Sequence, residues 1–444
     1  MNLFVSLFAR QLLRDLQQAP ARVRARGTDA GRVARCGTIA DLREAARREV
    51  PRAVFDFADG GAEDEITLHA NVTDLAALRL APRVLAGVGA VDLSATVFGR
   101  RLAVPLIGAP TGLTGMLHPR GELAIARALD RAGSLYTLST LGSTSIEEFA
   151  REVPGPSWFQ LYLWRDRGIV RDLVQRAQAS GYGALVVTVD VPRLGTRERD
   201  RRNSFGVPPR LTPRLFADSV RRPRWTARTL RDPHVTVASV STVRQGTAAD
   251  PASLVDYING QFDPAVSWAD LAWARAEWPG PLLVKGILRA DDARRAVDEG
   301  ADGVIVSNHG GRQLDGAISA IAALPAVVEE VGADAEVFMD GGIRRGTDIV
   351  KALALGARAC LVGRALLYGL AAGGDAGAER ALTILVDELR LALALAGCGA
   401  VSELDGTVLD LASLPPASLP PASRPPASLP PASWPPASRP VPRP

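Results

Sequence analysis

Residues 281–308, PLLVKGILRADDARRAVDEGADGVIVSN, decide the fold of this chain. Two apolar runs, Leu282–Gly286 and Gly303–Asn308, flank a helical pattern over Ala290–Glu299. Near-continuous apolar runs of this length are typical of parallel strands covered on both faces. Parallel neighbours need a crossover connection, which a helix between the two runs would supply. The stretch therefore predicts one β-α-β unit.

The same alternation of strands and helices recurs along the chain. Six further strand candidates are Ala103–Pro110, Leu135–Thr140, Ser157–Leu163, Ala184–Asp190, Glu336–Asp340 and Ala359–Gly363. Helical patterns between them include Gly121–Ala132, Asp166–Ser180 and Gly346–Leu355. Eight such units in roughly 300 residues predict an α/β fold of the (β/α)8 TIM-barrel type. A doubly wound sheet is the alternative, but no Gly-x-Gly-x-x-Gly sequence follows the first strand.

Three regions of the chain differ in composition. Residues 1–36 form an N-terminal extension, in which an apolar segment precedes an arginine-rich run. Residues 37–408 have the mixed composition of a folded domain. Residues 409–444 consist largely of repeated Leu-Pro-Pro-Ala-Ser. Because proline at this density blocks helix and sheet alike, we expect a disordered, extended C-terminal tail.

Two features of the folded domain lie outside the barrel pattern. Helical patterns over Ile39–Arg47 and Val54–Ala58 precede the first strand, and we expect them to form an N-terminal helical cap. The connection between strands four and five covers about 192–280 and is far longer than the roughly 2–6 residues usual for such links. It therefore indicates a functional insertion or a lid over the site.

Composition excludes several classes of protein. Of the 444 residues 47% are hydrophobic and 23% charged, which is typical of a globular protein. The 52 basic and 48 acidic residues are too balanced to indicate a nucleic-acid partner. No uncharged apolar stretch is long enough for a spanning helix, and no secretory signal is recognisable. The three cysteines lie far apart without metal-ligand spacing, so we expect a cytoplasmic protein with no metal site.

Polar residues stand at the carboxyl end of almost every predicted strand, where the active sites of barrel enzymes lie. In chain order they are Pro110, Thr111, Gly112, Ser139, Gln160, Tyr162, Thr188, Asp190, Arg197, Lys285, Ser307, His309, Arg312, Asp340, Gly341, Gly342, Arg344, Gly363 and Arg364. Since the strands themselves stay apolar, this set predicts one active site at that end of the barrel.

The residue types in this set indicate several kinds of chemistry. His309 is one of only four histidines and is the best-placed proton acceptor; Asp190 is either a helix cap or its orienting partner. The glycines after strands seven and eight are turns or, with Arg344 and Arg364, a phosphate site. Two interpretations of Lys285 remain: it stabilises negative charge on a cofactor ring, or it forms a Schiff base as in barrel aldolases.

The motifs of the chain resemble those of the FMN-dependent L-2-hydroxy acid dehydrogenases and oxidases. Ser-Asn-His-Gly-Gly-Arg-Gln-Leu-Asp at 307–315 is similar to the active-site signature of that family. Further similar motifs are Phe-Asp-Phe-Ala-Asp-Gly-Gly-Ala-Glu-Asp-Glu at 55–65, Ala-Pro-Thr-Gly at 109–112, Trp-Phe-Gln-Leu-Tyr at 158–162, Thr-Val-Asp-Val-Pro at 188–192, Val-Lys-Gly at 284–286 and Asp-Gly-Gly-Ile-Arg-Arg-Gly at 340–346. The family's bacterial quinone-linked L-lactate dehydrogenases are the most similar group.

This resemblance implies FMN as the cofactor and a role for each matching residue. His309 would be the catalytic base, Asp190 would stabilise its cation, Arg197 and Arg312 would hold the substrate carboxylate, and Tyr162 would bond the substrate oxygen. Pro110, Thr111, Gly112, Ser139, Gln160 and Thr188 would line the flavin ring, with Lys285 and Ser307 at its edge. The residues Asp340, Gly341, Gly342, Arg344, Gly363 and Arg364 would bind the ribityl chain and the phosphate.

One substrate-binding position departs from the family pattern. Many members have tyrosine where this chain has Phe57, so a hydrogen bond to the carboxylate is lost. Such a bond to a charged group contributes about 1.5–3 kcal/mol. The resemblance implies L-lactate as the substrate. The lost bond at Phe57 implies weaker binding of small acids, or a bulkier apolar acid as the alternative substrate.

The resemblance also implies partners. We expect a homo-oligomer, a tetramer in this family, and a quinone as electron acceptor; an oxidase that uses oxygen, or a flavoenzyme that acts on a modified peptide, is the alternative. An amphipathic pattern over 1–16 and an arginine-rich stretch over 210–231 suit peripheral contact with the inner face of the cell membrane. A helix docked on the barrel and a solvated basic loop explain the same two segments.

Overall fold

The computed structural model describes residues 28–203, 212–234, 237–241 and 260–414. The predictions for the apolar segment over 1–16 and for the proline-rich repeats after Leu414 concern residues outside these ranges.

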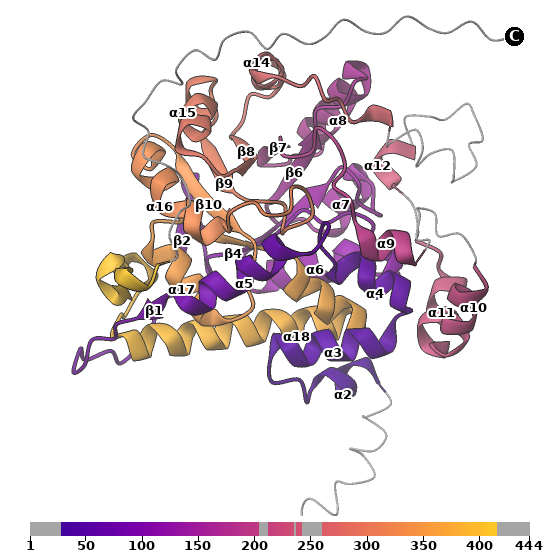
Figure 1. The fold of residues 1–444 in the computed structure, drawn as a ribbon, viewed down its shortest axis with the longest axis horizontal. Helices are drawn as coiled ribbons and strands as arrows, with labels where there is room; N and C mark the ends of the chain where they lie inside the picture. The colour runs from indigo at the N-terminus through magenta and orange to yellow at the C-terminus, as the bar shows by residue number, and fades with distance from the viewer. Residues whose placement is uncertain (1–27, 204–211, 235–236, 242–259, 415–444) are drawn as a thin grey trace, which may run out of the picture.

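Eight parallel strands close into a barrel in the order β10-β11-β4-β5-β6-β7-β8-β9 (Figure 1). The strands are β4 (Leu106–Gly108), β5 (Leu135–Ser139), β6 (Ser157–Tyr162), β7 (Ala184–Thr188), β8 (Leu282–Ile287), β9 (Gly303–Val306), β10 (Glu336–Asp340) and β11 (Cys360–Val362). Each lies within, or one residue beyond, a predicted apolar run. The predicted TIM barrel is confirmed, and the doubly wound alternative is wrong because the sheet closes.

A helix follows each strand and covers the outside of the barrel. In strand order these helices are α6 (Gly121–Arg131), α7 (Ile146–Glu152), α8 (Arg167–Ala179), α14 (Trp268–Glu277), α15 (Ala290–Asp298), α16 (Ala320–Val331), α17 (Gly346–Ala354) and α18 (Arg364–Ala396). Their apolar faces and the outward side chains of the strands form the larger of two buried clusters. Covering both faces explains why the strands read as unbroken apolar runs.

The interior of the barrel is filled by side chains from all eight strands. Among them Trp158 and Phe338 lie edge-to-face with ring centroids 5.5 Å apart. A hairpin of β2 (Ala95–Val97) and β3 (Arg100–Leu102) adds Phe98, whose ring lies 5.9–6.0 Å from both. The hairpin thus closes the amino-terminal end of the barrel, which leaves the carboxyl end open for a site.

The predicted cap consists of α2 (Asp29–Val33), α3 (Ile39–Glu49), α4 (Arg52–Asp59) and α5 (Ile66–Ala77). Figure 1 shows α2 and α3 beside the long helix α18. Val33 is buried in the main core, and β12 (Leu409–Asp410) pairs with β1 (Arg79–Leu80). Packed structure therefore extends beyond both ends of the range 37–408.

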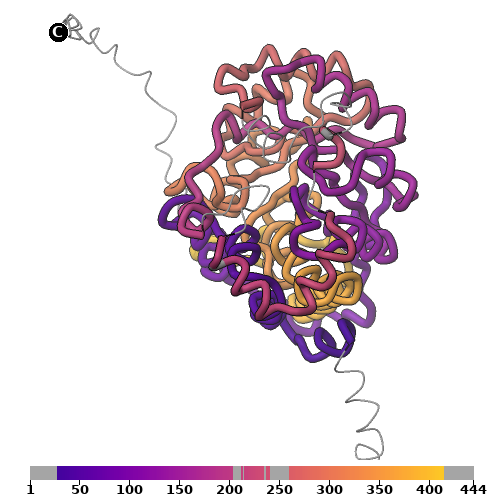
Figure 2. The backbone as a smooth tube through the Cα atoms, turned by 90° about the vertical axis from the view of Figure 1, so that its right-hand side faces the viewer, coloured from indigo at the N-terminus to yellow at the C-terminus, as the bar shows by residue number. Residues whose placement is uncertain are grey.

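The insertion between β7 and α14 folds next to this cap. Its described helices are α9 (Glu198–Arg202), α10 (Pro213–Val220), α11 (Pro223–Arg231) and α12 (Ala238–Ser241). Helices α9 and α10 both contact α4, and the views in Figures 1 and 2 show α9–α11 on the cap side of the barrel. Helix α12 lies instead beside α8, whose Arg176 donates to the carbonyl of Ser239 at 2.9 Å. Trp225 anchors α11, because its indole N–H donates to the carbonyl of Met116 at 2.9 Å. No helix in the described ranges is both long and apolar enough to cross a membrane.

Candidate active site

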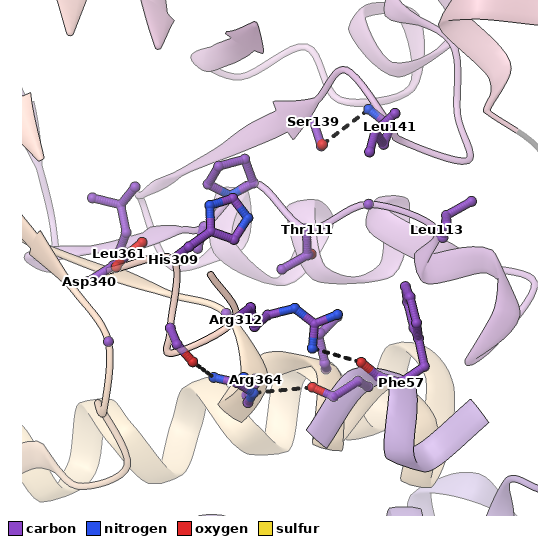
Figure 3. A pocket seen from close by; sticks show the side chains of 18 of the residues that line it. Phe57, Thr111, Leu113, Ser139, Leu141, His309, Arg312, Asp340, Leu361 and Arg364 are labelled. Carbon is purple, nitrogen blue, oxygen red and sulfur yellow. Dashed lines mark hydrogen bonds between the residues drawn. The ribbon is translucent and has the colours of Figure 1, made fainter. Parts of the chain in front are cut away.

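A cavity of about 350 Å³ lies at the carboxyl ends of the barrel strands and brings most of the predicted site residues together (Figure 3). Its lining includes Phe57, Pro110, Thr111, Gly112, Ser139, Tyr162, Arg197, Lys285, His309, Arg312, Asp340, Gly341, Gly342, Arg344, Gly363 and Arg364. A volume in this range is typical of small-molecule and cofactor sites.

The remaining four predicted residues lie directly behind this lining. Asp190 bonds His309, Gln160 accepts from the hydroxyl of Ser139, Thr188 accepts from Gln160, and Ser307 accepts from Lys285. All of these contacts are 2.8–3.1 Å long. These bonds hold Asp190, Gln160 and Ser307 against residues that line the cavity, and Thr188 is held through Gln160.

The pair His309–Asp190 has the geometry of an acid–base site. The Nδ1 atom of His309 lies 2.9 Å from Oδ1 of Asp190. Burial by itself raises the pKa of the Asp190 carboxyl, but the His309 ring and its hydrogen bond outweigh burial and hold that pKa below its ordinary value. An ionised Asp190 fixes the proton on Nδ1 and leaves Nε2 of His309 as the proton acceptor.

The loop that carries His309 is held in an unusual backbone conformation. His309, Gly310 and Gly311 follow one another with φ of 57°, 65° and 71°, in the left-handed region that side chains other than glycine rarely adopt. The amides of Asn308 and Asn71 pair through two 2.8 Å bonds and fix the base of the loop to α5. Strain of this kind is common at functional sites and persists where neighbouring contacts impose it.

Gln313 joins this loop to the start of the insertion. Its side-chain amide donates to the carbonyls of Asp190 and Arg193 at 2.9 and 2.8 Å. The side chain of Gln313 thus joins the loop that carries His309 to Asp190, the residue that orients the His309 ring.

Lys285 forms a buried ion pair at the cavity, next to the loop that carries His309. Its ammonium lies 2.9 Å from Oδ2 of Asp340 and donates to the hydroxyl of Ser307 at 2.8 Å. Burial alone lowers the pKa of Lys285, but the carboxylates of Asp340 and Asp190 outweigh it and raise that pKa. The lysine is therefore a fixed cation, which suits charge stabilisation and not the neutral amine that Schiff-base chemistry requires.

Four arginines of the cavity have no carboxylate within ion-pair distance in the part of the chain that the structure describes: Arg197, Arg312, Arg344 and Arg364. Burial is the main reason that the pKa values of Arg197 and Arg312 are lowered, and the charges of Arg197 and Arg364 depress that of Arg312 further. Burial also lowers the pKa of Arg364 to about 10. A concentration of buried positive charge is a site for anions.

The carboxyl end of α4 partly compensates two of these charges. Nη1 of Arg312 donates to the carbonyls of Phe57 and Gly60, both at 2.8 Å. Arg364 donates to the carbonyls of Ala58, Gly60 and Gly310 at 2.8–3.2 Å, which engages three of its five N–H groups and fixes its orientation. The last carbonyls of a helix have no partner within the helix, and cations are favoured there. Figure 3 shows both side chains pointing at the turn that carries Phe57.

Several buried polar atoms facing this region have no protein partner among the described residues. They are Oδ2 of Asp190, Oδ1 of Asp340 and Nε of Arg197. Buried polar atoms are normally hydrogen-bonded, so these three atoms indicate a bound polar ligand.

Most of the apolar residues that line the cavity, and one acidic residue, were not predicted from the sequence. Leu113, Leu117, Leu141, Val237 and Phe262 line the cavity from loops, where no periodicity distinguishes an inward side chain. Phe262, from the end of the insertion, lies edge-to-face on Tyr162 with ring centroids 5.3 Å apart. Asp200 also lines the cavity, and burial raises the pKa of its carboxyl. Its position in α9, three residues after Arg197, was the only available signal.

A closed parallel barrel with a histidine–aspartate pair and unpaired arginines at its strand ends defines an enzyme that acts on a small anion. The chain belongs to the FMN-dependent dehydrogenase family, whose model matches residues 46–411. An L-lactate dehydrogenase of Xanthomonas campestris is 46% identical over 374 residues, which cover 83% of this chain and 95% of that protein. An L-lactate oxidase of Nostoc sp. is 44% identical over 376 residues, 84% and 97% of the two chains.

Solved structures agree with this assignment. The crystal structure of the monotopic membrane protein (S)-mandelate dehydrogenase has a TM-score of 0.80 and 42% identity, and the match covers 84% of this chain and 98% of that one. This chain is therefore an FMN-dependent oxidoreductase that oxidises a 2-hydroxy acid. The resemblance drawn from the sequence is confirmed, and the alternative of a Schiff-base aldolase is wrong.

The donors in the cavity suit the parts of FMN. Helix α18 begins at the cavity with Gly363 as its N-cap and without a side-chain cap, so its first N–H groups and nearby Arg344 suit a phosphate. The fixed cation Lys285 suits the electron-rich edge of the ring. We infer that the predicted cofactor residues hold FMN in these positions.

We predict that Lys285→Met destabilises the protein by about 3–5 kcal/mol, because it leaves the buried carboxylate of Asp340 without its partner. Urea unfolding at neutral pH measures this loss of stability. The double variant Lys285→Met/Asp340→Asn should recover part of the loss; equal stability of Lys285→Met and wild type at neutral pH would contradict the assignment.

Proposed function

We propose that the protein oxidises L-lactate, or a closely similar L-2-hydroxy acid, to the 2-oxo acid and passes the electrons to a quinone. One observation carries the proposal: the His309–Asp190 pair and the unpaired arginines Arg197 and Arg312 line or adjoin a single cavity. The relatives named L-lactate dehydrogenase support lactate as the substrate. A modified peptide is disfavoured, since an amide needs no cationic clamp.

Arg312 and Arg197 hold the substrate carboxylate. The Nη1 atom of Arg312 is committed to two carbonyls of α4, so its orientation is fixed. Nε and Nη2 of Arg312 have no partner among the described residues and form the edge that a carboxylate binds in a forked pair. Binding an anion there relieves the mutual repulsion of the two guanidinium groups.

His309 accepts the substrate proton. Since Nδ1 faces Asp190, Nε2 is the atom that takes the proton, and Asp190 stabilises the resulting imidazolium. When FMN is bound, it supplies the acceptor for the two electrons of the substrate carbon–hydrogen bond that is broken. Tyr162 is buried beside the arginines, and burial raises the pKa of its hydroxyl, so it remains a hydrogen-bond donor to the substrate oxygen.

The quinone acceptor draws support from the insertion and from one neighbour. Helices α10 and α11 expose Phe216, Val220 and Leu230 among arginines, a combination that suits an anionic membrane surface. The structural neighbour (S)-mandelate dehydrogenase is a monotopic membrane protein. Oxygen is the second candidate acceptor, because one relative with 44% identity is an L-lactate oxidase.

We predict that His309→Gln keeps the flavin absorbance but slows its bleaching by L-lactate by several orders of magnitude, because glutamine cannot accept the proton. Anaerobic stopped-flow absorbance measures the rate. Ser145→Ala, which removes an N-cap that is not part of the cavity lining, serves as the matched control and should bleach at the wild-type rate. Normal bleaching of His309→Gln would remove His309 from the mechanism.

We predict that Phe57→Tyr strengthens the binding of short 2-hydroxy acids by roughly tenfold, the equivalent of about 1.4 kcal/mol. The Phe57 ring centroid lies 5.3 Å from the Arg312 guanidinium carbon, so an added hydroxyl enters the carboxylate site. Titration of the flavin spectrum with pyruvate gives the Kd. Unchanged or weaker binding would mean that the pocket is arranged for a larger acid.

We predict faster turnover with a soluble quinone analogue than with air, and retention of the protein on anionic vesicles at low salt. Parallel assays of quinone reduction and peroxide release separate the two acceptors. Rapid stoichiometric peroxide formation without quinone reduction would identify an oxidase and defeat the quinone proposal.

A further inference from the structure

One helical turn, residues 57–60 at the end of α4, is bound by four arginines. Arg312 and Arg364 reach its carbonyl oxygens from the cavity, as described above. Arg43 of α3 and Arg199 of α9 reach the carboxylate of Asp59 from the opposite side. The catalytic residues named so far do not include Asp59, although it stands at the centre of this arrangement.

Asp59 is deeply buried, with 4% of its surface exposed, and accepts hydrogen bonds from three elements. Arg43 binds it with both Nε and Nη2, at 2.6 and 2.7 Å. Nη1 of Arg199 lies 2.9 Å away, and the hydroxyl of Tyr368 in α18 lies 2.7 Å away. A buried carboxylate of this kind fixes the elements around it, because a change of position would leave charge unpaired.

The contact with Arg199 connects Asp59 to the substrate clamp, the pair Arg197 and Arg312 proposed to hold the substrate carboxylate. Arg199 lies in α9, a helix of five residues whose N-cap is Arg197 and whose third residue is Asp200; both line the cavity. Arg199 also pairs with Glu65. So short a helix does not hold its position without external contacts, and Arg199 provides it with three carboxylates from the cap, since Oδ1 of Asp56 also lies 3.8 Å from its Nη1. Arg43, by contrast, belongs to α3 on the outer side, and its other contacts are with Phe55 and Tyr368, neither of which lines the cavity.

The contact with Tyr368 connects Asp59 to the region of the cavity suited to phosphate, because Tyr368 packs on Arg344. The ring centroid of Tyr368 lies 5.6 Å from the guanidinium carbon of Arg344, and α18, which contains Tyr368, begins with Arg364. Contacts of Asp59 therefore reach both the region suited to phosphate and the region suited to the carboxylate.

We propose that Asp59 is a positioning residue for substrate binding: through Arg199 it fixes Arg197, and through its own helical turn it fixes the carbonyls that orient Arg312. The proposal rests on the proposed function, since it takes those two arginines as the clamp for the substrate carboxylate. Two guanidinium groups repel each other when no substrate is bound, so contacts outside the clamp must keep them close together in the binding geometry. Asp59 supplies the negative charge for that purpose without entering the cavity, where it would compete with the substrate.

The test compares two variants that each remove one arginine from the same carboxylate. Arg199→Gln should raise the KM for L-lactate and the Kd for pyruvate by about tenfold or more, with kcat within about threefold of wild type. Arg43→Gln breaks the bidentate pair with Asp59 yet should leave the KM and the Kd within about twofold of wild type, because the contacts of Arg43 do not reach Arg197 or Arg312. Arg199→Lys keeps a cation near Asp59 but loses the forked geometry, so it should recover only part of the binding, with a Kd about three- to fivefold above that of wild type. Steady-state kinetics, calorimetric titration of the FMN-loaded enzyme with pyruvate, and melting temperatures are the readouts.

A purely structural role would lower the melting temperature in both arginine variants and change binding equally in both. Equal weakening of pyruvate binding by Arg43→Gln and Arg199→Gln would therefore overturn the proposal, as would unchanged binding in Arg199→Gln. Should Arg199→Gln fail to fold, the same decision rests on Arg199→Lys, whose Kd must then exceed that of Arg43→Gln. A wild-type enzyme that neither binds pyruvate nor is reduced by any 2-hydroxy acid would instead refute the proposed function, an outcome that the variants do not affect.

Discussion

Uncompensated positive charge in a buried cavity is the constraint on which the rest of this structure depends. Arg197, Arg312, Arg344 and Arg364 line the cavity with no carboxylate within ion-pair distance among the residues described. Removing a charge from water without a counter-ion costs several kcal/mol. The protein offsets part of that cost with backbone carbonyls at the end of α4, and we infer that the phosphate of FMN and the carboxylate of the substrate offset the remainder.

The barrel makes this concentration of charge feasible because the chemistry is separated from the packing. Aromatic side chains such as Trp158 and Phe338 fill the interior, and the β2–β3 hairpin closes the far end. The loops at the carboxyl ends of the strands can then hold strained and charged groups, His309 among them, without loss of a continuous core. Of the carboxylates at the site, Asp190 and Asp340 are each paired with a group of the reaction site and do not neutralise the arginines. Asp200 lines the cavity as well, but it forms no ion pair with these arginines among the residues described.

All eight strands could be predicted from the sequence because buried parallel strands are continuous apolar runs, and their polar ends then pointed to the site. The bonds behind the lining could not be predicted: the resemblance implied that Gln160, Thr188 and Ser307 bind the cofactor, but nothing in the sequence indicates that Gln160 bonds Ser139 and Thr188 or that Ser307 bonds Lys285. Apolar lining from loops, such as Leu141 and Phe262, has no periodic signal. Likewise nothing local to Asp59 indicates its partners, since Arg43, Arg199 and Tyr368 are brought to it only by the packing of four elements.

The charge account is tested most directly by anaerobic stopped-flow reduction of Arg312→Lys, in which the cation is kept but the forked geometry is lost. The dependence of the bleaching rate on L-lactate concentration separates the Kd from the limiting rate. If the guanidinium binds the carboxylate through the edge that α4 leaves open, the Kd should rise by about 100-fold, or about 2.7 kcal/mol, while the FMN content is unchanged. A wild-type Kd in Arg312→Lys would contradict the account, because a point charge alone would then suffice.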